Sequence, residues 1–96
     1  MQTSFGEMEI LVKQDNKPQV EYLKFNSNGR SHQHKEYEFF FTTKGSGKVY
    51  VGDNIIEVKS GDLVTIPPNF PHWMEPDAGS VLEGLLWYHS SPLNIK

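Results

Sequence analysis

Turn-forming residues recur at short intervals along this chain of 96 residues and leave little room for helix. The segments between the turns are short and rich in β-branched and aromatic side chains, which is typical of strands. No segment carries an apolar repeat of 3.6 residues over several turns. The pattern therefore predicts an all-β fold, either a sandwich or a barrel. Strands are expected near residues 8–14, 19–25, 32–34, 37–43, 48–52, 55–59, 63–67, 72–75 and 81–89.

Length and composition exclude several classes of protein. A chain of this length forms a single domain, residues 1–96, with one modest core. The absence of cysteine excludes a disulfide scaffold and a thiolate metal site. A net charge of −3 argues against nucleic-acid binding. No apolar run is long enough to span a membrane and no signal peptide is visible, so a cytoplasmic location is expected.

Two histidines and a carboxylate lie in one short segment of the chain. Side chains at i and i+2 of a strand point to the same face, so His32 and His34 would lie side by side, about 6.5–7 Å apart at the backbone. One metal ion can bridge that spacing. Glu38 has the same parity but lies too far along a straight strand, so it joins the pair only if the chain bends around residues 35–37. The alternative is a pair of surface or hydrogen-bonding histidines on an edge strand.

A third histidine follows a restricted loop. Gly61 can adopt the positive φ of a tight turn, and a strand and a proline-rich loop, 67–71, then lead to His72. The prolines limit the conformational freedom of this loop, which makes it suitable for holding a third metal ligand. The alternative is an ordinary hairpin loop that ends in histidine.

These segments together resemble the two motifs of the cupin superfamily. The first family motif has two histidines separated by one residue, a glutamate four residues later and a glycine seven residues after that, as in His32, His34, Glu38 and Gly45.

The second family motif is matched with one change. Gly61, Pro67 and His72 have its spacing, and Asn69 stands in place of its middle glycine. Asparagine is among the residues that adopt positive φ most readily, so this change is benign. Two further positions depart from the family pattern, and neither is a ligand position in it: Asn26 and Pro76.

The resemblance implies a cupin double-stranded β-helix, which is a jelly-roll barrel of two antiparallel sheets. It also implies one divalent metal ion in the barrel: iron, manganese, nickel, zinc, cobalt or copper. An octahedral ion would keep a net positive charge and two open positions, which allows Lewis-acid catalysis or activation of dioxygen or water. The ligands that the resemblance implies are His32, His34, Glu38 and His72.

The last predicted strand supplies further candidates for the site. Its mixed polar and aromatic face carries Glu83, Trp87 and His89. This face lines the cavity, where Glu83 or His89 would act as general acid or base, or else it is an outer face in solvent. Two more residues are expected to line the pocket: Phe40 and Tyr50.

One strand in the middle of the chain is apolar on both faces. Tyr37, Phe39 and Phe41 share one face, and Phe40 lies on the other. A half-exposed strand would alternate apolar and polar residues, so both faces should be covered. The cover is either another part of the same chain or a second subunit, and a homodimer is expected because a small barrel has few residues with which to hide three aromatic rings.

The sequence leaves the function open between several classes. The first expectation is a metalloenzyme of oxygenase, lyase or isomerase type, acting on a small and anionic molecule. The alternatives are a non-catalytic ligand-binding or sensor barrel and a storage barrel whose metal only stabilises the fold, because one fold supports many functions. Arg30 either holds a substrate carboxylate or lies on the surface.

Overall fold

The computed structural model describes residues 1–89, which form seven antiparallel strands and no helix. This confirms the all-β prediction. Among the described residues, none forms a helix long and apolar enough to cross a membrane. The strands are β1 (Gly6–Gln14), β2 (Lys17–Phe25), β3 (Tyr37–Val51), β4 (Asn54–Lys59), β5 (Leu63–Ile66), β6 (His72–Pro76) and β7 (Leu82–His89).

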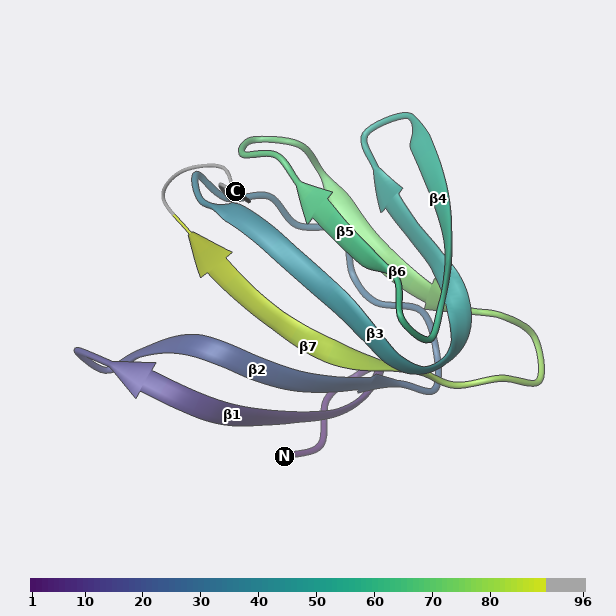
Figure 1. Ribbon diagram of the computed structural model, residues 1–96, viewed down its shortest axis with the longest axis horizontal. Helices are drawn as coiled ribbons and strands as arrows, with labels where there is room; N and C mark the ends of the chain where they lie inside the picture. Colours follow the sequence, from purple (N-terminus) through teal and green to yellow (C-terminus); the bar gives the residue numbers. More distant parts are fainter. Residues whose placement is uncertain (90–96) are drawn as a thin grey trace.

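The long strand β3 belongs to two sheets. Its first half pairs with β7 on one side and β5 on the other, and its second half pairs with β4 and β6. β2 extends the first sheet beyond β7, and β1 forms its edge. Figure 1 shows the two sheets facing each other as an open jelly roll that does not close into a complete barrel. The expected architecture of two antiparallel sheets is therefore confirmed.

Residues 44–47 were expected to form a turn between two strands, and this expectation is wrong, because they lie within β3. The pairing of β3 with β7 shifts register between Thr42 and Lys44. Gly45 has a φ of +83°, and a Cβ atom there would lie 1.8 Å from the carbonyl oxygen of Val81. The motif glycine thus lets β3 bend and approach its neighbour closely as it passes from one sheet to the other.

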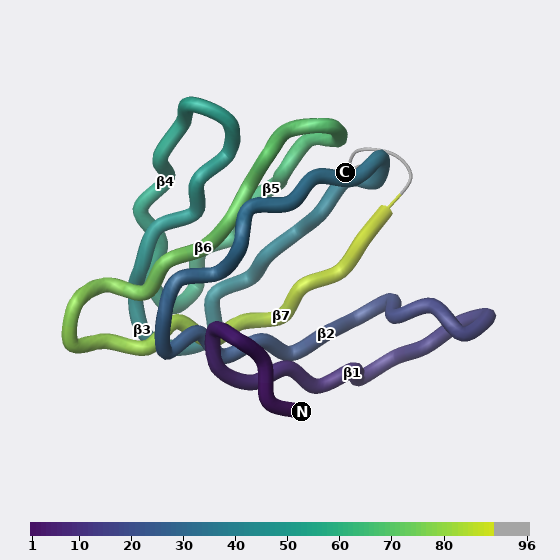
Figure 2. Tube along the Cα trace, turned by 180° about the vertical axis from the view of Figure 1, so that it is seen from behind, coloured from purple at the N-terminus to yellow at the C-terminus, as the bar shows by residue number. Residues whose placement is uncertain are grey.

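The strand expected at residues 32–34 is also absent. His32 instead forms an isolated bridge with His72, in which each backbone N–H donates to the carbonyl of the other. The backbone N–H of Gly29 also donates to the carbonyl of Met74. Figure 2 shows the connecting segment, residues 26–36, crossing the fold beside β6. These bonds hold the two parts of the candidate site together.

The apolar core fills the space between the sheets. On β3 the side chains of Val49 and Val51 point inward with Phe40, whose ring meets that of Phe25 at 6.4 Å. Phe39, on the opposite face, is fully buried within one chain and stacks on Trp87. Part of the aromatic face of β3 is therefore covered by the chain itself.

Candidate metal centre and cavity

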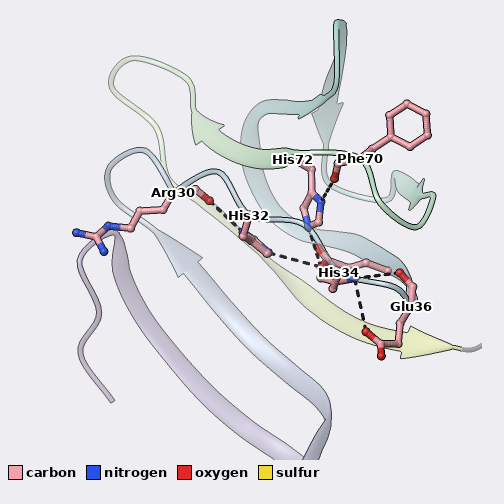
Figure 3. A network of polar contacts seen from close by, with 7 residues as sticks. Arg30, His32, His34, Glu36, Phe70 and His72 are labelled. Carbon is pink, nitrogen blue, oxygen red and sulfur yellow. Dashed lines mark hydrogen bonds and ion pairs between the residues drawn. The ribbon is translucent and has the colours of Figure 1, made fainter.

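Three histidines converge on the carboxylate of Glu38. Figure 3 shows the rings of His32, His34 and His72 gathered in one place. His32 and His34 come from the segment before β3, Glu38 is the second residue of β3, and His72 begins β6. One ligand atom of each residue can be chosen so that all four lie within 4.8 Å of one another. The Nε2 atoms of His34, His72 and His32 lie 2.8, 3.1 and 3.9 Å from Oε1 of Glu38. All four sequence-predicted ligands are thus brought together.

Glu38 reaches the histidines because the chain bends before β3 begins. Residues 35 and 36 form a bend, and β3 starts at Tyr37. The proline-rich loop supports the same segment from the other side, since the backbone N–H of Asn69 donates to the carbonyl of His34 over 2.8 Å. Asn69 has a φ of +66°, which agrees with the asparagine found in place of a glycine.

Backbone carbonyls hold the Nδ1 atoms of the three imidazoles. His32 Nδ1 lies 3.0 Å from the carbonyl of Arg30, His34 Nδ1 lies 3.0 Å from that of Glu36, and His72 Nδ1 lies 3.0 Å from that of Phe70. A carbonyl oxygen only accepts, so each Nδ1 must carry the hydrogen. Each Nε2 of a neutral ring is then a lone pair directed at Glu38. This is the second-sphere arrangement that orients histidine ligands toward a metal.

The donor set needs either protons or a cation at its centre. Three Nε2 lone pairs face a carboxylate oxygen, which also only accepts, so neutral rings leave these atoms without a hydrogen. Only protons on the rings or a bound cation can resolve this conflict. The second carboxylate oxygen, Oε2 of Glu38, is buried and has no hydrogen-bond partner in the described part of the chain. Imidazole nitrogens and carboxylate oxygens at these separations fit a metal with bonds of about 2.0–2.2 Å.

The histidines also keep the carboxylate ionised. Burial alone would raise the pKa of Glu38, but the contacts with His32, His72 and His34, when these rings are protonated, outweigh burial and lower its pKa to about 2. The Glu38 carboxylate, 3.9 Å away, in turn raises the pKa of His32 against an opposing effect of burial. The site is therefore built around a permanent negative charge.

A cavity of about 210 Å³ adjoins this group. His32 and Glu38 form part of its wall, so a molecule in the cavity would lie against the candidate metal ligands. Most of the remaining wall is apolar: Phe5, Met8, Leu23, Phe25, Met74 and Leu86. A second, more open groove approaches the group from the side of His34.

Two polar residues that sequence reasoning missed also line the cavity. Glu21 lies on the inner face of β2 and is only 8% exposed, and Tyr88 lies on the inner face of β7. Burial raises the pKa of the Glu21 carboxyl, although the hydroxyl of Tyr88 acts in the opposite direction. Tyr88 also packs its ring edge-on against His34 at 5.2 Å between centroids. These two side chains connect the cavity wall to the candidate ligands.

The sequence contained a signal for both residues. Glu21 alternates in phase with Leu23 and Phe25, which places a carboxylate on the apolar face of its strand. Tyr88 lies on the same face of its strand as Leu82 and Leu86. The mixed face of β7 drew attention because it is polar, yet the apolar face is the one that forms the cavity.

The mixed face of β7 is an outer face. Glu83 pairs across the strands with Lys24 and receives a hydrogen bond from the hydroxyl of Tyr22. His89 is exposed and lines the open groove rather than the cavity. Neither Glu83 nor His89 therefore occupies the cavity position that the proposed acid or base role required, and that role gains no support from their placement.

The expected pocket-lining residues are also placed elsewhere. Phe40 lies on the inner face but is fully buried in the core. Trp87 stacks on Phe39 outside the first sheet, at 5.6 Å between ring centroids. Tyr50 stacks on Trp73 at 4.7 Å, because its neighbours on β3 take the inward positions. The expectation that they line the cavity is corrected accordingly.

Arg30 is exposed, and Figure 3 shows its side chain directed away from the three histidines. It contributes to the cavity wall, and its backbone carbonyl accepts the hydrogen bond from His32. Its clear role in this structure is thus to orient a candidate ligand.

Solved structures resemble this fold over most of its length. A cupin-like protein from Thermotoga maritima matches 96% of this chain and 83% of its own, with a TM-score of 0.80 and 24% identity. A cupin 2 conserved barrel domain protein from Rhodopseudomonas palustris matches 91% of this chain and 62% of its own, with a TM-score of 0.75 and 23% identity. These likenesses support the fold.

Two curated relatives are similar over about half of this chain. A gentisate 1,2-dioxygenase from Haloferax sp. is 33% identical over 54 residues, which are 56% of this chain and 15% of the relative. Acireductone dioxygenase 1 from Pectobacterium atrosepticum is 36% identical over 50 residues, 48% of this chain and 29% of the relative. The chain thus spans less than a third of either relative.

The family model for the cupin domain matches residues 20–88. The match includes all four candidate metal ligands and runs from β2 to β7. With the fold, the motifs and this match in agreement, the chain belongs to the cupin family.

Proposed function

We propose that the protein binds one divalent metal ion through His32, His34, Glu38 and His72, and that it is a metal-dependent enzyme acting on a small organic molecule. One observation carries the proposal. The three Nδ1 atoms all face backbone carbonyls, so three Nε2 lone pairs and an ionised carboxylate are aimed at one point.

A metal bound there would supply Lewis acidity or a site for oxygen activation. The chain's own residues would hold the metal, orient the histidine rings and shield a bound molecule from water. The carbonyls of Arg30, Glu36 and Phe70 fix the histidine rings. Glu38 is buried away from water, so its charge interacts more strongly with a bound cation. The apolar wall of the cavity would exclude water from a bound molecule.

Oxygen chemistry is the reaction class that the relatives favour. Both curated relatives described above are dioxygenases by name. Because the chain covers only a small part of each, their substrates are not transferred to it. We still expect a small substrate whose anionic end lies nearest the metal. The two positive charges of the ion and the one negative charge of Glu38 leave a net positive charge there.

The test combines metal loading with turnover. Tag-free protein is loaded separately with Fe²⁺, Mn²⁺, Ni²⁺, Co²⁺, Zn²⁺ or Cu²⁺ and assayed for oxygen uptake with a panel of small organic acids, phenols and enediols. Oxygen uptake that depends on one metal and is lost in His32→Asn supports the proposal. Stoichiometric metal with no turnover on any substrate class would instead favour the non-catalytic binding or sensor barrel. The cytoplasmic location remains a proposal that cell fractionation would test.

A further inference from the structure

A buried carboxylate faces the otherwise apolar cavity. Glu21 is held on the central part of β2, with its neighbours on the same face, Leu23 and Phe25, buried beside it. A carboxylate in such a place is costly unless it has hydrogen-bond donors. Tyr88 shares the cavity wall with Glu21, and its hydroxyl acts to lower the pKa of that carboxyl, but no hydrogen bond of normal length joins the two side chains. An ionised carboxylate has about four acceptor positions, so most of this capacity is free for another donor.

The size and polarity of the cavity restrict what can supply that donor. An apolar cavity of about 150 Å³ holds a benzene ring. A cavity of about 210 Å³ therefore has room for one ring, or an aliphatic body of similar size, with one or two small substituents. Its wall carries Glu21 and Glu38, and each carboxylate disfavours an anionic group placed next to it. Arg30 also belongs to the wall, but its exposed side chain is directed away from the histidines. The part of a ligand that meets Glu21 should therefore be neutral or a hydrogen-bond donor.

Resting on the proposed function, we propose that Glu21, which faces the cavity beside Tyr88, selects compact and mainly apolar molecules that carry a hydroxyl group or another hydrogen-bond donor. The donor would face Glu21 from inside the cavity, and the opposite end of the molecule would face His32 and Glu38. Glu21 is then a specificity-determining residue, and Tyr88 is a polar neighbour in the same cavity wall. A site built to receive a hydroxyl group rejects the analogue that lacks it, because its own polar group is left unpaired.

The outer face of the same two strands offers a matched control. There Tyr22 of β2 donates a hydrogen bond to Glu83 of β7, in a carboxylate–tyrosine pair that lies outside the cavity. Replacing either glutamate by leucine removes the same groups from one pair or the other. Only the inner change should alter recognition of a small molecule.

The experiment compares three ligands of nearly equal shape: phenol, toluene and anisole. Phenol has a donor, anisole has only an acceptor, and toluene has neither. Binding to the full chain is followed by NMR titration at about pH 8, well above the ordinary pKa of a carboxyl group. The titration is run on zinc-loaded protein and again after treatment with a chelator. Wild-type protein and Glu83→Leu are expected to bind phenol about tenfold more tightly than toluene or anisole, which corresponds to about 1.4 kcal/mol.

Three variants give the inference its sharpest test. Glu21→Leu should lose the preference for phenol and bind toluene at least as well as wild type does. Glu21→Gln retains an acceptor and should keep a reduced preference. Tyr88→Phe removes the neighbouring hydroxyl group but leaves Glu21 in place, so this variant should still prefer phenol to toluene.

The inference is overturned if phenol and toluene bind wild type equally. It is overturned as well if no ligand binds at low millimolar concentration, or if Glu21→Leu retains the wild-type preference. Because the comparison is made with and without zinc, its outcome is separable from that of the proposed metal centre. A preference that survives without metal supports Glu21 even if the metal proposal fails, and equal binding in zinc-loaded protein refutes Glu21 alone.

Discussion

The Nε2 atom of His72 lies 3.1 Å from Oε1 of Glu38, and both side chains are fully buried. The other ring nitrogen of His72 faces the carbonyl of Phe70, so a neutral ring has no hydrogen left for the carboxylate. Two acceptors in contact away from water are stable only with a proton or a cation between them. This pair is the buried half of the candidate metal centre, and the two more exposed histidines complete it.

The first prediction concerns the pH dependence of stability. The pKa of His32 is raised above its ordinary value of 6.5 by the Glu38 carboxylate 3.9 Å away. In metal-free protein, the resulting stabilisation is present below pH 6.5 and is lost as the pH rises through the raised pKa. It should amount to less than about 1 kcal/mol, because the side chain of His32 is half exposed.

Zinc should reverse this trend, because metal ions compete with protons for the same nitrogens and bind better as the pH rises. Urea denaturation at several pH values between about 6 and 8, with and without zinc, measures both effects. The His32→Asn variant should flatten the metal-free profile. A zinc-induced stabilisation that is constant over this range would contradict the expectation.

A second prediction concerns a buried hydroxyl group. Thr42 Oγ1 is buried and lacks a hydrogen-bond partner among the described residues. Thr42→Val keeps the shape of the side chain and removes the unsatisfied group, so it should stabilise the protein by about 1 kcal/mol. Thermal unfolding of this variant beside Thr65→Val, at an exposed position of β5, is the measurement. Equal or opposite effects at the two positions would show that Thr42 has a partner, such as a buried water.

A third prediction separates backbone strain from close packing. Gly45 and Gly61 have φ values of +83° and +98°, but a Cβ atom would meet Val81 only at Gly45, with nothing within 4 Å at Gly61. Gly61→Ala should cost about 1–2 kcal/mol from the positive φ alone. Gly45→Ala should cost clearly more, because backbone atoms must also move. Similar losses in chemical denaturation would argue against the tight passage of β3 between the sheets.

A fourth prediction concerns oligomeric state. The outer face of the first sheet carries the half-buried rings of Phe41 and Trp87, with Leu63 43% exposed beside them. If two copies cover this face, size exclusion should give about twice the mass of 11.0 kDa. Phe41→Lys should then yield monomer, whereas Ile55→Lys, on the other sheet, should not.

Phe39 is unsuitable for this test, because it is fully buried within one chain and its replacement would disturb folding. A wild-type protein that remains monomeric at high concentration would remove the case for a homodimer. It would show that the chain alone covers enough of its aromatic face.

The all-β class was predictable from local signals in the sequence, and the jelly roll and the ligand set were predicted from the resemblance to the two cupin motifs. Turn residues, short strands and ligand spacing are properties of neighbouring residues, and Asn69 adopts the positive φ that its place in the motif requires. The continuity of β3 was not predictable in the same way. Gly45 and its neighbours resemble a turn locally, and only pairing with β7 makes them part of a strand.

The cavity wall was harder to predict than the ligands. Which face of β7 points inward depends on pairing with β2 and β3, so Glu83 was singled out from the sequence and Tyr88 was missed. Glu21 was overlooked because a single carboxylate in a strand is usually solvated. The available signal was that Glu21 lies on the same face of its strand as the apolar residues Leu23 and Phe25.

The most direct test of the central claim is the metal content of tag-free protein, measured by elemental analysis after loading and dialysis at neutral pH. We compare wild type with the double variant His32→Asn/His34→Asn, and use His89→Asn, which replaces an exposed histidine outside the group, as the control. The account predicts about one equivalent of a divalent transition metal in wild type and control, and little in the folded double variant. A folded wild-type protein that retains none of the six metals, or a double variant that retains as much as wild type, would contradict it.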